Sequence, residues 1–589
     1  MKIVLVGVNS KYIHTNIAVR YIKKYCSEFE ITIKEYTIND SIYNIMSDLY
    51  KSSPDVICFS CYIWNIEVVL KLCSNFKKIK PEITTILGGP EVSFDSSDLM
   101  RDNLFIDYII KGEGEVSSKQ FFNYLNGNIY NIKEVNGLVY RVEDNILENE
   151  CAELIEKLDD IPFPYDGEYL DDKYVEEDHL QVNYLKDKIL YYESSRGCPY
   201  RCSYCLSSTI KGVRFFSKER IEKDLLWFIE KNVKLVKFVD RTFNCSKYAY
   251  DIFKFIIQNS KYTKFHFEIS ADILDIKTIE LLKTAPHGLI QFEIGLQSTN
   301  VETLDLIDRK MDLESLNNNI LKLRECDNIH LHLDLIAGLP GEGYDSFSKS
   351  INDTFSLRPH MLQLGFLKLL KGSKMRNEAH NFGISFTDYP PYEVLKTDSI
   401  SYDQLLMLKH IEDIIDRYYN SGRFNATLKY LMSISKDPFM LFKNIGEYKK
   451  MFIQNNRNLS NIEQYRLLYD FCMSTGKKDM HIVKECLAFD YLLQGRNPVV
   501  PDFLLSDRII DRQLLWDLMS DRNIINNYLP NYEGKDVKKI IKDVYARNFS
   551  LNICAYIDSG EIINKDNVII FDYGSSVING NVSYFCICV

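Results

Sequence analysis

Short apolar runs alternate with amphipathic segments along the first part of the chain. Residues 16–26, for example, place apolar side chains at helical spacing after an apolar run. The apolar runs cover residues 2–7, 55–60, 83–87 and 105–110. Such alternation is typical of α/β domains and predicts a doubly wound parallel sheet. We expect this N-terminal domain to span residues 1–150, with a hairpin turn at Asn136 and Gly137.

Loops at the carboxyl ends of parallel strands form the ligand crevice of a doubly wound sheet. In this chain the loops are residues 7–14, 60–64, 88–93 and 112–115. Their candidate ligand contacts are Asn9, Ser60, Tyr62, Gly88, Gly89, Glu91, Gly112 and Glu113. The glycines either let a ligand approach the backbone or only form turns. Because no G-x-G-x-x-G follows the first strand, a nicotinamide or flavin dinucleotide is disfavoured.

A second α/β pattern begins after residues 151–187, which are rich in proline and acidic residues around position 160 and are interpreted as a linker. Apolar runs then return at residues 189–193, 235–240, 265–270, 290–296, 329–339 and 361–367. Six strand–helix pairs predict a partial parallel barrel over residues 188–376. Its active face is expected at the carboxyl ends of the strands.

Residues 377–589 change to apolar stripes at helical spacing, such as Leu405, Leu408 and Ile411. The pattern predicts a mostly helical C-terminal domain, with short strands near its end, such as residues 568–571. The predicted fold class is therefore α/β: a doubly wound parallel sheet, a partial (β/α)6 barrel and a mostly helical domain.

The charge balance and the lengths of the apolar runs disfavour two classes of partner. The 589 residues include 71 basic and 82 acidic side chains, and the net charge of -11 repels phosphate backbones at long range. No run approaches the roughly 18 apolar residues of a membrane-spanning helix, and no signal peptide is recognisable at the start. We expect a cytoplasmic protein with neither nucleic acid nor membrane as a partner.

Three of the 15 cysteines carry the strongest chemical signal. Cys198, Cys202 and Cys205 form a C-x3-C-x2-C motif in the loop after the first predicted barrel strand. Three thiolates from one loop can hold three irons of a [4Fe-4S] cluster and leave the fourth iron open. Zinc is an alternative, although a structural zinc site needs four ligands and usually two C-x2-C pairs. Redox-active or simply buried cysteines are a further alternative.

The motif resembles the signature of the radical S-adenosylmethionine (SAM) enzymes, in which an aromatic residue precedes the third cysteine, as Tyr204 does here. The resemblance implies that the amino and carboxylate groups of SAM chelate the open iron. One electron from the cluster then breaks the sulfonium bond, and the resulting 5'-deoxyadenosyl radical abstracts a hydrogen atom from the substrate.

Later strand ends resemble the same family. Asp240 in FVDRTFN matches a position that faces the SAM amino group, and Glu293 in FEIGLQS matches one that binds the ribose hydroxyls. DLIAGLPG, with Asp334 and Gly338, resembles the element beside adenine. Glu268 in FEISAD adds another acid at a strand end, and we include it in the implied SAM site.

The N-terminal domain resembles the cobalamin (B12)-binding domain of B12-dependent radical SAM enzymes. The whole arrangement resembles an uncharacterised bacterial group of these proteins with an extra C-terminal domain. Ser60, Gly88 and Gly89 match positions that line the nucleotide tail of the corrinoid. The D-x-H-x-x-G motif that supplies a lower axial histidine is absent, so cobalamin is expected to bind without that ligand. His14 is either a replacement ligand or a loop histidine with an ordinary hydrogen bond.

The resemblance implies an enzyme that uses a [4Fe-4S] cluster, SAM and cobalamin. In relatives that methylate, one SAM supplies a methyl group to cobalamin and a second SAM generates the substrate radical. The methyl group then reaches an unactivated carbon or a phosphinate phosphorus. For this chain the expected partners are an unknown small-molecule or peptide substrate and an electron donor such as flavodoxin or ferredoxin. We also expect a cluster that is labile in air.

Three alternatives remain open. The first is a B12-assisted rearrangement or cyclisation without methyl transfer. The second is a methylthiotransferase-like RNA modification, for which Cys58 and Cys61 form a C-x2-C pair, although Cys58 falls in a predicted buried strand and the chain is acidic. The third is a non-enzymatic corrinoid or cluster sensor whose C-terminal region binds a protein.

Overall fold

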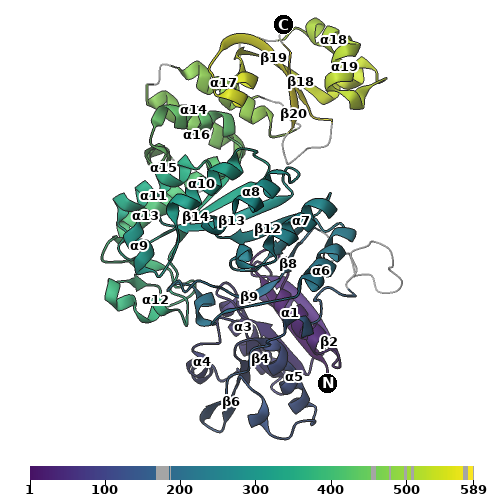
Figure 1. Cartoon of the computed structure of the whole chain (residues 1–589), viewed down its shortest axis with the longest axis vertical. Helices are drawn as coiled ribbons and strands as arrows, with labels where there is room; N and C mark the ends of the chain where they lie inside the picture. The colour runs from purple at the N-terminus through teal and green to yellow at the C-terminus, as the bar shows by residue number, and fades with distance from the viewer. Residues whose placement is uncertain are drawn as a thin grey trace. The chain divides into compact units, whose positions relative to one another are not determined.

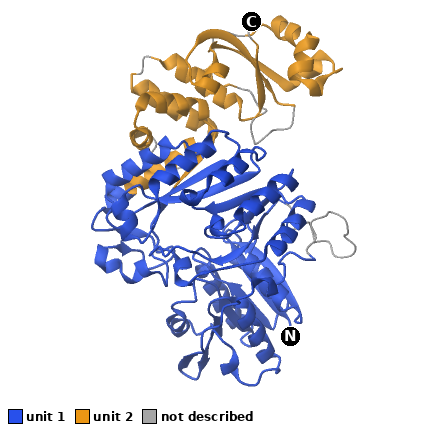
Figure 2. Ribbon diagram, viewed as in Figure 1, with its two compact units in different colours: residues 1–360, 364–405 blue, residues 361–363, 406–589 orange. Residues whose placement is uncertain are grey.

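The computed structural model of the chain describes residues 1–167, 185, 187–452, 459–476, 479–495, 500–505, 510–574 and 582–587. The chain forms two compact units (Figure 2). Unit 1 contains residues 1–360 and 364–405, and unit 2 contains residues 361–363 and 406–589. Figure 1 labels the helices and strands.

A seven-stranded sheet opens unit 1, in the order β2-β1-β3-β4-β5-β6-β7. Its strands are β1 (Ile3–Asn9), β2 (Ile31–Thr37), β3 (Val56–Ser60), β4 (Thr84–Gly88), β5 (Tyr108–Ile110), β6 (Leu138–Val142) and β7 (Asn145–Glu148). Its helices are α1 (Ile17–Tyr25), α2 (Ile42–Lys51), α3 (Ile66–Ile79), α4 (Ser96–Asp102) and α5 (Gly114–Leu125). Pairs among β1 to β5 are parallel, and β6 and β7 are antiparallel additions.

Helices cover both faces of this sheet, which explains why every residue of β1 is buried. Alternate side chains of a strand point to opposite faces. Val4, Val6 and Val8 accordingly pack into one apolar cluster, whereas Ile3 and Leu5 pack into another. The predicted doubly wound parallel sheet is confirmed.

Two details of this sheet differ from the sequence-based expectation. The hairpin turn predicted at Asn136 and Gly137 is wrong, because these residues precede β6 and the turn to β7 lies at Glu143 and Asp144. Strand β2 was not anticipated. It lies at the sheet edge, where only one neighbour covers it, so its sequence ITIKEYT mixes polar and apolar residues.

The second sheet has the order β15-β14-β13-β12-β11-β8, and all its strands belong to unit 1 except the first three residues of β15. Its strands are β8 (Ile189–Tyr192), β11 (Leu235–Phe238), β12 (Lys264–Ile269), β13 (Ile290–Gln297), β14 (His330–Ala337) and β15 (Met361–Phe366). Its helices are α6 (Lys218–Glu230), α7 (Ala249–Asn259), α8 (Ile276–Lys283), α9 (Val301–Leu306), α10 (Leu313–Arg324) and α11 (Tyr344–Ser356). The pairs from β8 to β14 are parallel, as the prediction of a partial parallel barrel requires.

The two faces of this second sheet differ in chemistry. Phe238, Phe267 and Phe292 are fully buried. The rings of Phe267 and Phe292 pack against Phe253 of α7, and Phe238 packs against Phe267. The intervening positions of the same strands carry polar side chains. We call this polar face, made of Lys237, His266, Glu268, Glu293, His332 and Asp334, the inner face.

Short elements complete unit 1. A two-stranded hairpin of β9 (Ser195–Gly197) and β10 (Val213–Phe215) follows β8, and the segment after β15 contains α12 (Lys374–Asn377), β16 (Ser385–Phe386) and β17 (Val394–Lys396). The described part of the connection between the sheets, up to residue 167, packs closely. Tyr165 is fully buried, and Phe163 contacts Trp227 and Phe228 of α6.

Unit 2 is mostly helical, as predicted. Its helices are α13 (Tyr402–Ile414, which begins in unit 1), α14 (Asn425–Ser435), α15 (Pro438–Phe452), α16 (Asn461–Ser474), α17 (Met480–Leu492), α18 (Arg512–Ser520), α19 (Arg522–Tyr528), α20 (Val537–Asp543) and α21 (Ile553–Ser559). An antiparallel sheet contains β18 (Val544–Leu551), β19 (Asn564–Asp572) and β20 (Ser583–Ile587). Across the described ranges, no helix has both the length and the apolar character needed to cross a bilayer.

Candidate functional site

The three cysteines of the motif lie in the loop between β9 and β10, beside the carboxyl ends of the second sheet. Gly197 directly precedes Cys198 and has a φ of +107°. A Cβ atom there would collide with the carbonyl oxygen of Gly212 across the hairpin, so the entry to the loop requires glycine. Cys202 is the most deeply placed of the three, at 5% exposure, whereas Cys198 and Cys205 are partly exposed.

The three thiols are not all as close to one another as the ligands of a single zinc ion would be. Sulfur atoms around one tetrahedral zinc lie ~3.8 Å apart, because Zn–S bonds are about 2.3 Å long. Among the described residues, one set of three potential ligands has all its atoms within 4.8 Å of one another, and it does not contain the cysteines. The three sulfurs, as they stand in this structure, therefore do not form a closed tetrahedral zinc site, and a [4Fe-4S] cluster held by this loop stays a prediction.

A neighbouring segment holds the cysteine loop in place. Ser203 donates its backbone N–H to the Ile307 carbonyl at 2.9 Å and accepts the Met375 N–H at 2.8 Å. Tyr204 is partly buried, and burial raises the pKa of its hydroxyl. Two buried polar atoms near the loop, Arg309 Nε and Gln297 Oε1, have no hydrogen-bond partner in the described structure, as expected beside a site that receives a polar group.

Asp240 is buried just beyond the end of β11 and contacts the segment that leads into the cysteine loop. Its Oδ2 accepts the Ser194 N–H at 3.0 Å, and its Oδ1 accepts the Ser194 and Ser195 hydroxyls at 2.6 and 2.5 Å. Burial raises the pKa of this carboxyl group. Both oxygens are thus engaged by the protein, and a contact between Asp240 and SAM stays a prediction.

Glu293 lies at the centre of the inner face. Its Oε2 is 2.8 Å from Lys237 Nζ and 2.9 Å from His266 Nε2. Burial opposes ionisation, but His266 and Lys237 outweigh it and hold the pKa of Glu293 well below its usual range. The site therefore presents Glu293 as a carboxylate, the form that accepts hydrogen bonds from hydroxyl groups.

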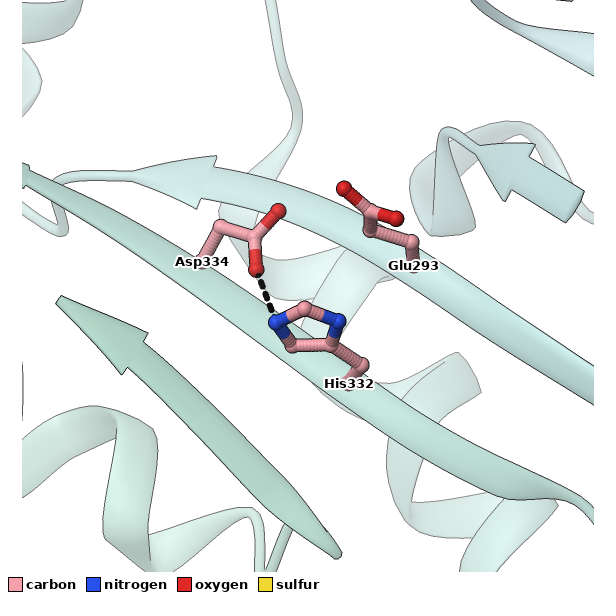
Figure 3. Close-up of side chains that lie close together, drawn as sticks. All are labelled: Glu293, His332 and Asp334. Carbon is pink, nitrogen blue, oxygen red and sulfur yellow. Dashed lines mark ion pairs between the residues drawn. The ribbon is translucent and has the colours of Figure 1, made fainter. Parts of the chain in front are cut away.

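His332 and Asp334 follow one another on the same face of β14, and His332 pairs directly opposite Glu293 of β13 (Figure 3). His332 Nε2 lies 2.6 Å from Asp334 Oδ1. Burial disfavours the charged imidazole, but Asp334 and Glu293 outweigh it and raise the pKa of His332. These three residues are the set within 4.8 Å, and Lys237 already supplies a positive charge to Glu293, which disfavours a metal ion there.

The remaining predicted SAM contacts lie at neighbouring strand ends. Glu268 of β12 is opposite Glu293 in the sheet register and 3.7 Å from Arg241 Nη1. Gly338 follows β14 and lies against the side chain of Val394 in β17. The structure thus brings Glu268, Glu293 and Asp334 together on the inner face, as predicted from the sequence, while their contacts with SAM stay predictions.

Glu342 is a buried acid, 1% exposed, in the loop that precedes α11. Its Oε1 accepts the hydroxyls of Ser298 at 2.7 Å and Ser350 at 2.9 Å. Burial raises its pKa to about 7. The loop is next to the predicted adenine element, so the protonation of Glu342 bears on the stability of this part of the barrel.

We expect Glu342 to make the stability of unit 1 depend on pH. The folded chain keeps this proton up to about pH 7, whereas an unfolded glutamate loses it near pH ~4.3. The stabilisation by protonated Glu342 is therefore full below pH ~4.3 and is lost as the pH rises to about 7, a change of up to about 4 kcal/mol. Thermal melts of metal-free protein between about pH 5 and about pH 8 should show a smaller decline for Glu342→Gln, which does not titrate. Equal declines in both proteins would contradict this assignment.

Small residues line the carboxyl edge of the first sheet. The sheet register aligns Gly7, Ser60, Gly88 and Ile110. A Cβ atom added at Gly88 would meet only the Ile110 carbonyl, at 3.6 Å, and one at Gly112 would meet nothing within 4 Å. The backbone is therefore open to a ligand at Gly88 and Gly112, but not at Gly7, where an added Cβ would lie 3.0 Å from Asn16.

Other predicted corrinoid contacts serve the chain itself. Asn9 Nδ2 donates to the His14 carbonyl at 3.0 Å and to Glu35 at 3.1 Å. Gly89 has a φ of +107°, and a Cβ there would lie 2.6 Å from the Cys61 carbonyl oxygen, so its glycine is explained without a ligand. Tyr62 stacks on Trp64 with ring centroids 4.4 Å apart, in the same loop.

Glu91, also among the predicted corrinoid contacts, binds the segment that follows β15. Its Oε1 accepts the Tyr392 hydroxyl at 2.5 Å and lies 3.6 Å from Lys371 Nζ. Glu91 is only 5% exposed, and burial raises its pKa. A role in corrinoid binding stays a prediction for this residue.

Glu113 belongs to a partly buried group of five charges that joins the two sheets, which we call the ion cluster: Glu113, Glu115, Glu193, Arg196 and Arg214. Arg196 lies 2.5 Å from Glu115, 3.0 Å from Glu193 and 3.2 Å from Glu113. Arg214 pairs with Glu113 as well. Burial raises the pKa of Glu193 to about 7, against the effect of Arg196.

His14 also connects the two sheets. Its Nδ1 is 2.7 Å from the Tyr191 hydroxyl, and Ile189 donates its N–H to the Ile13 carbonyl at 2.7 Å. Burial and nearby lysines lower the pKa of His14. Two roles were considered for His14: a replacement cobalt ligand, and a loop histidine with an ordinary hydrogen bond. The structure shows the hydrogen bond.

Cys58 and Cys61 do not resemble a second cluster site. Cys58 lies in β3 and Cys61 directly follows it, and Cys61 is completely buried. Burial raises the pKa of both thiols, which disfavours the thiolate form that binds metal.

Sequence reasoning missed Arg309, Lys237, His266 and Arg196. Lys237 and His266 occupy the polar positions of alternating strands, so their place on the inner face was readable from the pattern. Arg196 and Arg309 contact residues 81 and 107 positions away, and no local pattern indicates such partners.

Comparison with protein families gives three matches along the chain. Residues 3–121 match the B12 binding domain, and residues 192–354 match the Radical SAM superfamily. Residues 380–571 match a family described as a protein of unknown function, DUF4080.

Two curated relatives are methyltransferases by name. The 2-(S-pantetheinyl)-carbapenam-3-carboxylate methyltransferase of Streptantibioticus cattleyicolor is 26% identical over 52% of this chain and 46% of its own length. The cobalamin-dependent radical SAM methyltransferase TokK of Streptomyces tokunonensis is 25% identical over 62% of this chain and 55% of its own length. The chain thus spans about half the length of these relatives.

A solved structure shares the fold. The cobalamin-dependent SAM radical enzyme OxsB, in a complex with aqua-cobalamin and SAM, matches 83% of this chain and 78% of its own chain. The TM-score is 0.57 at 15% sequence identity, which establishes a common fold.

Proposed function

We propose that this chain, a radical SAM enzyme with an N-terminal B12-binding domain, transfers a methyl group to an unactivated carbon, or to a phosphinate phosphorus, of a small molecule or peptide. When bound, the [4Fe-4S] cluster with SAM supplies the radical and cobalamin carries the methyl group. Cys198, Cys202 and Cys205 would hold the cluster. The open edge at Gly88 and Gly112 would receive the corrinoid.

One observation carries this proposal: segments at the carboxyl edge of the first sheet contact β8 and β9, the strands that lead into the cysteine loop. The loop after β1 reaches Tyr191 through His14, and Glu113 and Glu115, at the start of α5, reach Arg196, two residues before Cys198. If cobalamin carries the methyl group and the cluster with SAM supplies the radical, the two cofactor sites must face one another. These contacts within unit 1 support such an arrangement of the first sheet and the cysteine loop.

The inner face indicates how the chain would orient its ligands. Glu293, kept ionised by Lys237 and His266, offers an acceptor for ribose hydroxyls, and the buried phenylalanines behind the strands keep the sheet rigid. Lys237, His266 and the His332–Asp334 pair favour a substrate with polar or charged groups over a purely apolar one. The names of the two relatives support methyl transfer to a small molecule.

The test uses SAM with a deuterated methyl group. Protein produced anaerobically with cobalamin would be reduced. It would then be incubated with this SAM and a small-molecule extract of the cells that naturally make the protein. We expect 5'-deoxyadenosine and a product three mass units heavier than with ordinary SAM. A product without the label would favour rearrangement or cyclisation, and an inert cluster would favour a sensor. Either result would contradict methyl transfer.

A further inference from the structure

Arg309 contacts the candidate cluster loop although it lies outside every motif identified above. It follows α9, and its backbone N–H donates to the Leu304 carbonyl at 2.9 Å. Asp308, directly before it, has a φ of +56° and lies 2.8 Å from Lys374 Nζ. The backbone bond from Ser203 to Ile307 fixes this turn against the cysteine loop.

The Arg309 guanidinium group makes three contacts next to the most buried thiol. Nη1 lies 3.8 Å from Cys202 Sγ, within hydrogen-bond range for sulfur, and Nη2 donates to the Gly295 carbonyl at 2.8 Å. The group also lies over the Tyr200 ring, 5.4 Å from its centre. Nε is buried without a hydrogen-bond partner in the described residues.

These contacts matter because the reduction potential of an iron–sulfur cluster depends on nearby charge, on hydrogen bonds to sulfur and on solvent exposure. Arg309 is positively charged at every relevant pH. Cys202 is only 5% exposed, so water screens this charge weakly. A fixed positive charge and an N–H···S bond both stabilise the reduced cluster, which carries one more negative charge.

We propose that Arg309 is a positioning residue that tunes the cluster, donating a hydrogen bond to the Cys202 thiolate and making the cluster easier to reduce. This inference rests on the proposed function, because it assumes that Cys202 is a cluster ligand. The planar guanidinium reaches both Cys202 and the Gly295 carbonyl, a geometry that lysine does not reproduce.

The test is a redox titration of reconstituted protein without SAM, cobalamin or substrate, followed by electron paramagnetic resonance of the reduced cluster. At the midpoint potential of the unaltered protein, Arg309→Met should lower the ratio of reduced to oxidised cluster at least about tenfold, equivalent to about 59 mV for one electron. Arg309→Lys keeps the charge but loses the geometry, so it should shift in the same direction by less. Lys374→Met is the matched control, because it removes a nearby exposed charge that does not contact a thiol.

Unchanged midpoints in both Arg309 variants, at equal iron content, would overturn the inference. So would an unchanged midpoint together with weaker SAM binding, since Arg309 would then act on SAM. If Arg309→Met does not retain iron, Arg309→Lys decides the question. A midpoint potential of Arg309→Lys equal to that of the unaltered protein would then overturn the inference. A shifted midpoint in a protein that transfers no methyl group would reject the proposed function alone.

Discussion

Replacing Cys202 by alanine should abolish the iron–sulfur cluster and, with it, SAM cleavage. A site-differentiated cluster has three protein ligands, so the loss of one leaves two irons without a protein sulfur. Cys202 is also the cysteine of the motif that contacts Arg309 and lies deepest in the loop. After anaerobic reconstitution, iron per chain, visible absorbance and 5'-deoxyadenosine formation should all fall to background.

Two other cysteines provide matched controls for this experiment. Cys326 is exposed and Cys73 is fully buried, and both belong to unit 1. Alanine at either position should leave iron content and SAM cleavage close to those of the unaltered chain. If a variant with alanine at Cys198, Cys202 and Cys205 retained the metal content of the parent, the radical chemistry proposed here would have no basis.

Replacing Arg196 by methionine should produce the largest loss of stability. Arg196 is 10% exposed and contacts three carboxylates that are themselves at most 17% exposed. Its removal leaves buried negative charges uncompensated, which typically costs about 3–5 kcal/mol in the free energy of unfolding. Thermal and urea unfolding of metal-free protein would measure the loss. Arg196→Lys should also destabilise, because one ammonium cannot satisfy three carboxylates in this geometry.

An exposed ion pair in helix α4 of unit 1 supplies the control for Arg196. Arg101 and Asp98 are 66% and 71% exposed, so Arg101→Met should change the free energy of unfolding by less than about 1 kcal/mol. Similar effects of Arg101→Met and Arg196→Met would show that the ion cluster contributes little, and that the first sheet is held to the cysteine loop by other contacts.

Local patterns predicted the main elements of the fold because strand and helix periods are local properties. The fully buried β1 and the alternating β12 and β13 were recognisable for that reason. The edge strand β2 was not, since its burial depends on which strand lies beside it, and the hairpin expected in this region has its turn at Glu143 and Asp144 instead of Asn136 and Gly137. The short hairpin of β9 and β10, which holds the cysteine loop, was missed for the same reason.

The residues of the candidate site also differ in whether local sequence identifies them. The cysteine motif lies within eight consecutive residues, so spacing alone identifies it. Glu91 and Glu113 lie in loops of the correct kind, but their partners Tyr392 and Arg196 come from distant parts of the chain. A loop position indicates that a side chain is available for contact, whereas only the folded chain determines what it contacts.

The backbone bond from Ile189 to Ile13 has a consequence for splitting the protein. Together with the Thr15 hydroxyl, which donates to the Ile189 carbonyl at 3.0 Å, it makes β8 depend on a segment from the start of the chain. A fragment ending near residue 150 would keep Glu113 and Glu115 but lose both arginines. We therefore expect the fragment ending near residue 150 and the rest of unit 1 to be soluble only when they are synthesised together, because they fold as one cooperative unit.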